Sequence, residues 1–118
     1  SYAVFRRLKA AGKVPADMRF QVSLPTPLAV IAQYVEASAQ AAVEGPYETR
    51  LFTEAREILA AIPHRELAVQ WDVAVEFAVL EGLRRVHFAP VEAGVVARLK
   101  ALRGLVPPAV EMGFHLCY

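Results

Sequence analysis

Three short segments that alternate apolar and polar residues constrain the fold of this chain more than any other feature. Residues 18–24, 66–72 and 110–118 each place apolar side chains on one face and mostly polar ones on the other, as β-strands do. Helical stretches separate these segments, and strands joined by helical crossovers are typically parallel. The order of elements therefore predicts an α/β fold with a parallel sheet.

The segments between the strands carry the signals of helices. A short helix is expected over residues 2–11, ahead of the first strand. Thr26 and Pro27 suit the N-cap and the first position of the helix that follows this strand. We expect Gly45-Pro46 to divide this region into two helices, and two more helices to follow the second strand. Besides the helix over residues 2–11, the four predicted helices are residues 28–43, 47–62, 73–80 and 91–103.

The size and charge of the chain exclude several classes of protein. Its 118 residues form one small unit, and a hydrophobic content of 56% argues against disorder. The net charge of +1 provides neither a basic footprint for nucleic acid nor a polybasic patch for a membrane surface. One cysteine excludes an intrachain disulfide. No apolar run is typical of a membrane span and no signal peptide is visible, so we expect a cytoplasmic protein.

Polar side chains fall late in each of the three predicted strands. They are Gln21 and Ser23, then Gln70 and Asp72, then His115 and Cys117. The carboxyl ends of parallel strands meet at one edge of a sheet, where α/β folds place their sites. We therefore predict a site at this edge, with a solvated sheet face as the alternative explanation.

His115 and Cys117 lie two residues apart on a predicted strand, so their side chains point the same way. An imidazole and a thiolate at this spacing can both reach one zinc ion. The alternative is a core cysteine beside an unrelated histidine, because cysteine is among the most buried residue types. For Asp72, the alternative to a catalytic role is the N-cap of the helix that starts at Val73.

Three motifs carry a resemblance to a known family. The segment GFHLCY at 113–118 resembles the H-x-C-Y segment of cobalamin-independent methionine synthase, whose His and Cys bind zinc. AVQWD at 68–72 resembles the strand of that family whose Asp contacts the amino-acid substrate, and LPTP at 24–27 resembles its substrate loop. Over residues 18–118 the chain is similar to poorly characterised members of the wider group that includes uroporphyrinogen decarboxylase.

This resemblance implies part of a (β/α)8 TIM barrel, with residues 1–118 supplying about three β/α units. It implies a zinc-dependent methyl- or alkyltransferase that acts on a small-molecule thiol with a methyl donor. Asp72 would orient a substrate ammonium, and His115 and Cys117 would bind zinc. The residues expected to form hydrogen bonds with the substrate are Gln21, Ser23, Thr26 and Gln70.

Two departures from the family leave other functions open. Asp72 is followed by Val73 and Ala74, where the family has Glu and Pro, and the family's remaining zinc ligands, a Glu and a Cys, do not occur after Cys117 in this sequence. The alternatives are a non-catalytic barrel fragment or ligand-binding relative, and a metal-free decarboxylase-like enzyme. Because a whole barrel takes about 250 residues, we expect a partial chain completed by the rest of its barrel or by further copies.

Four other residues have simpler expected roles. Trp71 faces the helices by alternation and is expected in the core. Glu76 is expected at the surface or behind the ligands rather than as a ligand. Glu111 lies early in its strand, where it would pair with a buried base or with solvent, and His87 lies in a loop that could approach the site.

Overall fold

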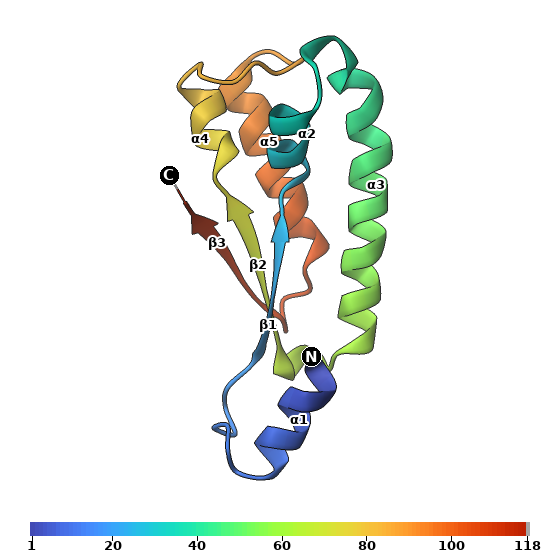
Figure 1. Cartoon of the computed structure of the whole chain (residues 1–118), viewed down its shortest axis with the longest axis vertical. Coiled ribbons are helices and arrows are strands. Elements are labelled where there is room, and N and C mark those ends of the chain that lie inside the picture. The colour runs from blue at the N-terminus through green and yellow to red at the C-terminus, as the bar shows by residue number, and fades with distance from the viewer. Residues whose placement is uncertain (118) are drawn as a thin grey trace.

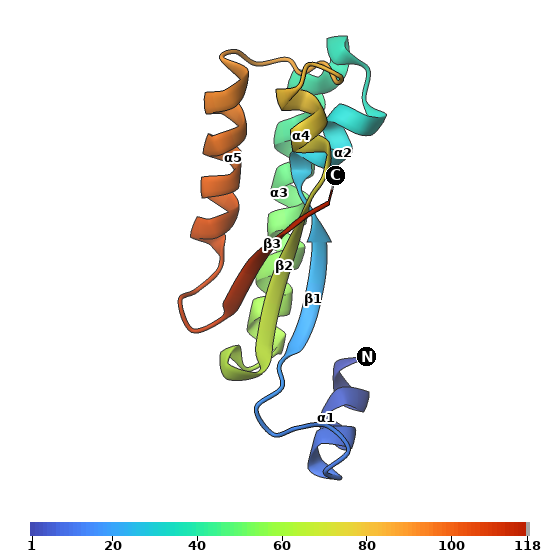
Figure 2. The same ribbon diagram turned by 90° about the vertical axis from the view of Figure 1, so that its left-hand side faces the viewer.

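The computed structural model describes residues 1–117 and contains a three-stranded sheet with its long helices on one face (Figures 1 and 2). The elements in chain order are α1 (Tyr2–Ala10), β1 (Phe20–Pro25), α2 (Pro27–Tyr34), α3 (Ala37–Ala61), the 3-10 turn η1 (His64–Glu66), β2 (Leu67–Val73), α4 (Val75–Leu80), α5 (Val91–Leu105) and β3 (Glu111–Leu116). The predicted α/β class, with parallel strands joined by helical crossovers, is confirmed.

The strands lie in the order β1-β2-β3, and both pairs are parallel. Their register places polar residues in rows that cross the sheet. From the amino to the carboxyl end, the rows are Gln21–Ala68–Glu111, Ser23–Gln70–Gly113 and Pro25–Asp72–His115. The backbone N–H of Cys117 donates to the Val73 carbonyl at 3.2 Å, which extends the pairing of β3 beyond the last row.

The other face of the sheet forms the core. Trp71 is 0% exposed, as predicted, and it packs with Leu67 and Val69 of the same strand. Side chains from two helices cover them, namely Leu51, Ala55 and Leu59 of α3 and Leu102 of α5. Burying a valine or leucine side chain stabilises the folded state by about 1.5–3 kcal/mol. The apolar side chains of the alternating pattern thus pack the sheet against α3 and α5.

The expected break at Gly45-Pro46 is wrong, because α3 continues through Pro46. The chain turns instead at Val35 and Glu36, between α2 and α3. A proline inside a helix removes one hydrogen bond and costs about 3 kcal/mol. Buried residues lie on both sides of Pro46, so tertiary packing along the whole of α3 offsets this cost. Those residues are Gln40, Glu44, Leu51, Ala55 and Leu59.

At the amino end of the sheet, Arg19 connects the starts of all three strands. Its Nη1 donates to the carbonyls of His64 at 2.9 Å and Ala109 at 3.2 Å, and its Nε lies 2.9 Å from Glu111 Oε1. The expectation that Glu111 pairs with a base is therefore confirmed. These bonds lock the strand register at the end opposite to the predicted site.

The sheet is open, and the described residues do not close a barrel. The molecule measures 52 × 26 × 24 Å, and α1 lies below the amino end of the sheet (Figure 1). Its radius of gyration is 16.3 Å, whereas a compact domain of this length has one of about 13.5 Å. None of the helices in residues 1–117 is both long and apolar enough to cross a lipid bilayer.

Candidate functional site

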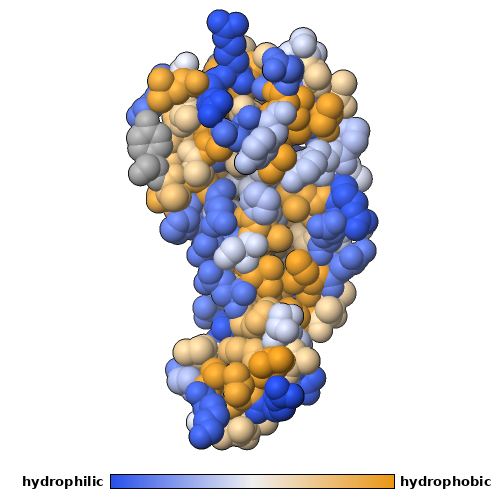
Figure 3. Space-filling model, in the orientation of Figure 1, coloured by the Kyte–Doolittle hydropathy of each residue, from blue (hydrophilic) through white to orange (hydrophobic). Residues whose placement is uncertain are grey.

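The sheet face that turns away from the helices is polar and bare. Along β1 its residues Gln21 and Ser23 are exposed, and along β3 so are Glu111 and His115. In Figure 3 the hydrophilic residues follow the strands down the left side of the view. The period-two alternation of the sequence therefore separates a core face from a polar face, as predicted.

A chain of hydrogen bonds crosses this polar face. Gln21 Nε2 donates to Ser23 Oγ at 3.3 Å and to Gln70 Oε1 at 3.0 Å. Gln70 Nε2 then donates to Asp72 Oδ1 at 2.9 Å. Four of the predicted site residues thus belong to one network, which orients the Asp72 carboxylate at the carboxyl end of β2.

Asp72 does not cap a helix. β2 extends to Val73, α4 begins at Val75, and Ala74 occupies the N-cap position without a side-chain hydrogen bond. The N-cap alternative for Asp72 is therefore wrong. The strand continues because Val73 is buried and pairs with Leu116 of β3, which holds Asp72 in the sheet.

His115 and Cys117 lie at the carboxyl end of β3, next to Asp72. His115 is in register with Asp72, and Cys117 follows directly after the end of β3, where its N–H donates to the Val73 carbonyl. Both residues are exposed, so the alternative of a core cysteine is wrong. Neighbouring parallel strands lie about 4.8 Å apart, and this spacing brings the imidazole and the carboxylate to adjacent positions on one rim.

These donors fit a zinc ion only in part. Catalytic zinc sites use three protein ligands, and structural sites use four. Within residues 1–117 no group of three or more His, Cys, Asp or Glu side chains could hold a metal ion. The described part of the chain therefore offers His115 and Cys117 as a pair of donors, and a further donor would have to come from elsewhere.

Thr26 lies beneath the rim rather than on it. It is 1% exposed, and its Oγ1 accepts the Ala29 N–H at 3.0 Å, so the predicted N-cap is confirmed. The same hydroxyl donates to Glu76 Oε1. A substrate would therefore have to displace existing bonds to reach Thr26.

Glu76 is buried, so of the two positions expected for it the surface is wrong, and a place behind the predicted ligands remains. Only 2% of it is exposed, and within the described chain its Oε2 has no hydrogen-bond partner. Burial raises the pKa of Glu76, and the hydrogen bond from Thr26 opposes this shift without cancelling it. α4 turns this residue inward beside the second apolar cluster, which contains Leu28 and Val79.

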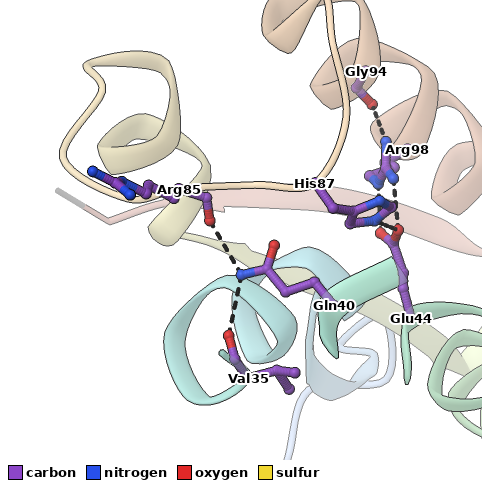
Figure 4. A network of polar contacts seen from close by, with 7 residues as sticks. All are labelled: Val35, Gln40, Glu44, Arg85, His87, Gly94 and Arg98. Atoms are coloured by element: carbon purple, nitrogen blue, oxygen red, sulfur yellow. Dashed lines mark hydrogen bonds and ion pairs between the residues drawn. The ribbon is translucent and has the colours of Figure 1, made fainter. Parts of the chain in front are cut away.

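A second polar cluster, which sequence reasoning missed, lies among α3, α5 and the loop before α5 (Figure 4). Glu44 Oε1 and Oε2 lie 2.6 Å from Arg98 Nε and Nη2, and His87 Nε2 lies 2.6 Å from Oε2. The Arg98 guanidinium also stacks on Phe88, 3.6 Å from the ring centroid. The hydrogen bonds from Arg98 lower the pKa of Glu44 despite its burial.

The spacing of α3 held a signal for this cluster. Gln40, Glu44, Leu51, Ala55 and Leu59 share the buried side of the helix, with separations of four or seven residues. Placing a helix break at Pro46 separated the two polar members from the three apolar ones. His87 therefore belongs to this packing cluster rather than to the predicted site.

The surface of the described residues contains hollows, of which two bear on the site. One of about 310 Å³ lies between the α2–α3 turn and the loop after α4, where Gln40 Nε2 donates to the carbonyls of Val35 and Arg85 at 3.1 Å (Figure 4). The other, of about 350 Å³, lies on the polar face of the sheet. It is lined by Gln21, Ala68, Val69, Gln70, Glu111, Met112 and Gly113.

Comparisons of the chain with protein-family models, with curated proteins and with solved structures gave no match.

Proposed function

We propose that this chain supplies the substrate rim of a transferase that acts on a thiol, similar to methionine synthase. The observation that carries the proposal is the row of Asp72 and His115 at the carboxyl end of the sheet, with Cys117 next along β3. A hydrogen-bond network that ends on Asp72 supports it. The resemblance of residues 68–72 and 113–118 to the methionine synthase motifs supports it independently.

We also propose that the sheet is part of a (β/α)8 barrel. All three strands are parallel, the long helices cover one face, and the opposite face is polar and bare. In such a barrel the helices lie outside and active sites lie at the carboxyl ends of the strands. Further strands, from the rest of the barrel or from further copies, would cover the polar face and the free edges.

In this proposal Asp72 binds the ammonium group of the substrate. Gln70 uses one N–H to hold Asp72 Oδ1, and Gln21 holds Gln70 in turn. A carboxylate fixed in this way can accept a charge-assisted hydrogen bond without first losing side-chain freedom. Gln21, Ser23 and Gln70 would thus position the carboxylate, and their exposed atoms would also contact the substrate.

His115 and Cys117 would be two zinc ligands. When bound, zinc would hold the substrate thiol as a thiolate at neutral pH. The third donor would come from outside residues 1–117. The other partners in this proposal are a small-molecule thiol and a methyl donor in the cytoplasm.

A second candidate is a ligand-binding relative or a metal-free decarboxylase-like enzyme on the same scaffold. The observation that favours this candidate is the number of metal ligands, because residues 1–117 bring together fewer than the three that a zinc site needs. In that case the polar face would bind its ligand through hydrogen bonds alone.

Metal binding by the chain separates the two candidates. We expect the protein with its barrel completed, by the rest of the barrel or by further copies, to retain zinc after loading with Zn²⁺ and dialysis, and to lose it in Cys117→Ser and in His115→Ala. With Co²⁺ bound in place of zinc, we expect a thiolate-to-metal absorption band that Cys117→Ser removes. His64→Ala is the matched control, because His64 lies in η1 at the opposite end of the sheet.

Circular dichroism of each variant checks that the fold is intact. Equal and low zinc contents in the completed protein and in its Cys117→Ser variant would contradict the transferase proposal and leave the second candidate.

A further inference from the structure

The hollow between the α2–α3 turn and the loop after α4 has a buried amide at its floor (Figure 4). Gln40 is 2% exposed, and its Nε2 donates to the carbonyls of Val35 and Arg85 at 3.1 Å. Both of these residues line the hollow, so the amide lies between its two walls. Within residues 1–117 the buried Oε1 of Gln40 has no hydrogen-bond partner. A buried acceptor without a partner is costly, and a ligand that donates a hydrogen bond to it would remove this cost.

Cationic groups surround the same hollow. Arg84 and Arg85 line it, both are exposed, and neither belongs to an ion pair among residues 1–117. α3 begins in the lining at Ala37, and its N-cap residue Glu36 makes no side-chain cap. The first N–H groups of a helix have no partner within the helix and attract anions. Glu36 is the one carboxylate among the described lining residues, so the two guanidinium groups leave the hollow with a positive charge.

Two large apolar side chains are exposed at the same place. Tyr34 is 79% exposed and Leu83 is 69% exposed, and both line the hollow. Their backbones are fixed, because α2 ends at Tyr34 and the Leu83 N–H donates to the Ala78 carbonyl at 2.8 Å. The hollow has a volume of about 310 Å³, and sites for small molecules begin at about 300 Å³. The carbon skeleton of a small ligand can therefore lie against these two side chains.

We infer that this hollow binds a small phosphate ester that carries hydroxyl groups. Arg84 and Arg85 would hold the phosphate oxygens through paired N–H groups, together with the first turn of α3. A hydroxyl group would donate to Gln40 Oε1. The positive charge requires an anion and the buried acceptor requires a donor, so neither a simple carboxylate nor a neutral polyol satisfies both.

The hollow is separate from the row of Asp72 and His115. It lies towards the same end of the sheet, because α2 follows β1 and α4 follows β2. Both of its walls belong to the described residues, so it is complete without further strands at the free edges of the sheet. The inference uses neither zinc nor a thiol, and it therefore stands apart from the transferase proposal.

Isothermal titration calorimetry on the complete protein, in its native assembly, tests the inference. The probe is glycerol phosphate at low ionic strength, with glycerol as the neutral counterpart and methyl phosphate as the counterpart without hydroxyl groups. We expect saturable binding of glycerol phosphate and none of glycerol. Methyl phosphate should bind about fivefold more weakly, because it lacks the hydrogen bond to Gln40.

Three variants locate the binding. Arg84→Gln combined with Arg85→Gln removes both cations from exposed positions, so it should weaken the binding of glycerol phosphate about tenfold or more. Arg56→Gln is the matched control and should leave the affinity unchanged, because Arg56 is exposed on α3 and does not line the hollow. Gln40→Met removes the buried acceptor, so it should abolish the preference for glycerol phosphate over methyl phosphate.

Three results would overturn the inference. They are the absence of saturable heat with glycerol phosphate, equal affinities for glycerol phosphate and methyl phosphate, and an unchanged affinity in the variant that lacks both arginines. Circular dichroism checks the fold of each variant. If Gln40→Met does not fold, the arginine variant and the methyl phosphate titration decide the question.

Discussion

Glu44 and Glu76 are both buried, at 9% and 2% exposed, yet their surroundings are opposite. Glu44 receives both arms of the Arg98 guanidinium and contacts His87. Glu76 receives a hydrogen bond from Thr26, and within the described chain its second oxygen has no partner. The pKa of Glu44 is accordingly lowered by its hydrogen bonds with Arg98, and the pKa of Glu76 is raised by burial.

Burial alone does not set the charge of a carboxyl group. Desolvation acts on both residues in the same direction, and a cationic partner reverses the result at Glu44 only. Glu44 joins α3 to α5 as an ion pair, which is costly to break from one side. Glu76 lies beside the end of β1, where burial shifts its equilibrium towards the neutral form.

The largest expected effect comes from removing the cation. Arg98→Met leaves Glu44 buried without its main partner, so the free energy of unfolding at pH 7 should fall by about 3 kcal/mol. Arg50→Met is the control, because the Arg50–Glu54 pair is 67% and 47% exposed. That control should cost about 0.5 kcal/mol or less. Urea denaturation of both variants measures the difference. Equal losses of unfolding free energy would contradict the role of the Glu44–Arg98 ion pair in joining α3 to α5.

Gly94 tests the packing that supports this ion pair. A Cβ at Gly94 would overlap the Phe88 ring on which Arg98 stacks, so Gly94→Ala should destabilise the chain by about 2 kcal/mol. Gly104→Ala on the same helix meets nothing within 4 Å and should stabilise the chain by about 0.5 kcal/mol. Thermal unfolding of the two variants should move in opposite directions.

Glu44→Gln tests the lowered pKa. A group whose pKa is lowered in the folded state stabilises the fold above its unfolded pKa, and this contribution is lost as the pH falls through the folded pKa. We expect the variant to be less stable than the unmodified chain by about 1.5 kcal/mol at pH 7. The gap should close below about pH 4, where glutamates become protonated. A gap that is independent of pH would count against the ion pair.

Glu76→Gln should give the smallest effect, with the opposite sign. A raised folded pKa means that stability is lost as the pH rises from about 4.3, the ordinary value for glutamate, through the folded pKa. The neutral amide avoids this loss, so the variant should be about 1 kcal/mol more stable at pH 7 and should approach the unmodified chain at low pH. Urea titrations across this range measure it, and a destabilised variant at pH 7 would indicate that the carboxylate is paired.

Local patterns predicted the elements that carry the candidate site. The alternation of residues 66–72 placed Trp71 in the core and Gln70 and Asp72 on the polar face, and the register confirms this separation. Thr26 followed by Pro27 predicted the start of α2. These features depend on neighbours within a few residues, which is why they could be derived from the sequence.

The helix through Pro46 could not be derived in this way. Local propensity favours a break at Gly45-Pro46, and the buried residues on both sides of it override that preference. The hollow over Gly113 was equally invisible, because its walls come from three strands. Closure into a barrel and the identity of a third metal donor stay predictions.

Parallel strands with helical crossovers, a core face and a polar face follow from the amino-acid sequence alone, because side-chain alternation along a strand is a local property. Which polar groups are buried, and which of them meet a cation, depends on contacts between distant parts of the chain. Glu44 meets Arg98 across 54 residues, and Thr26 meets Glu76 across 50. The energy of a buried carboxyl depends on such distant partners, and folding alone brings them together.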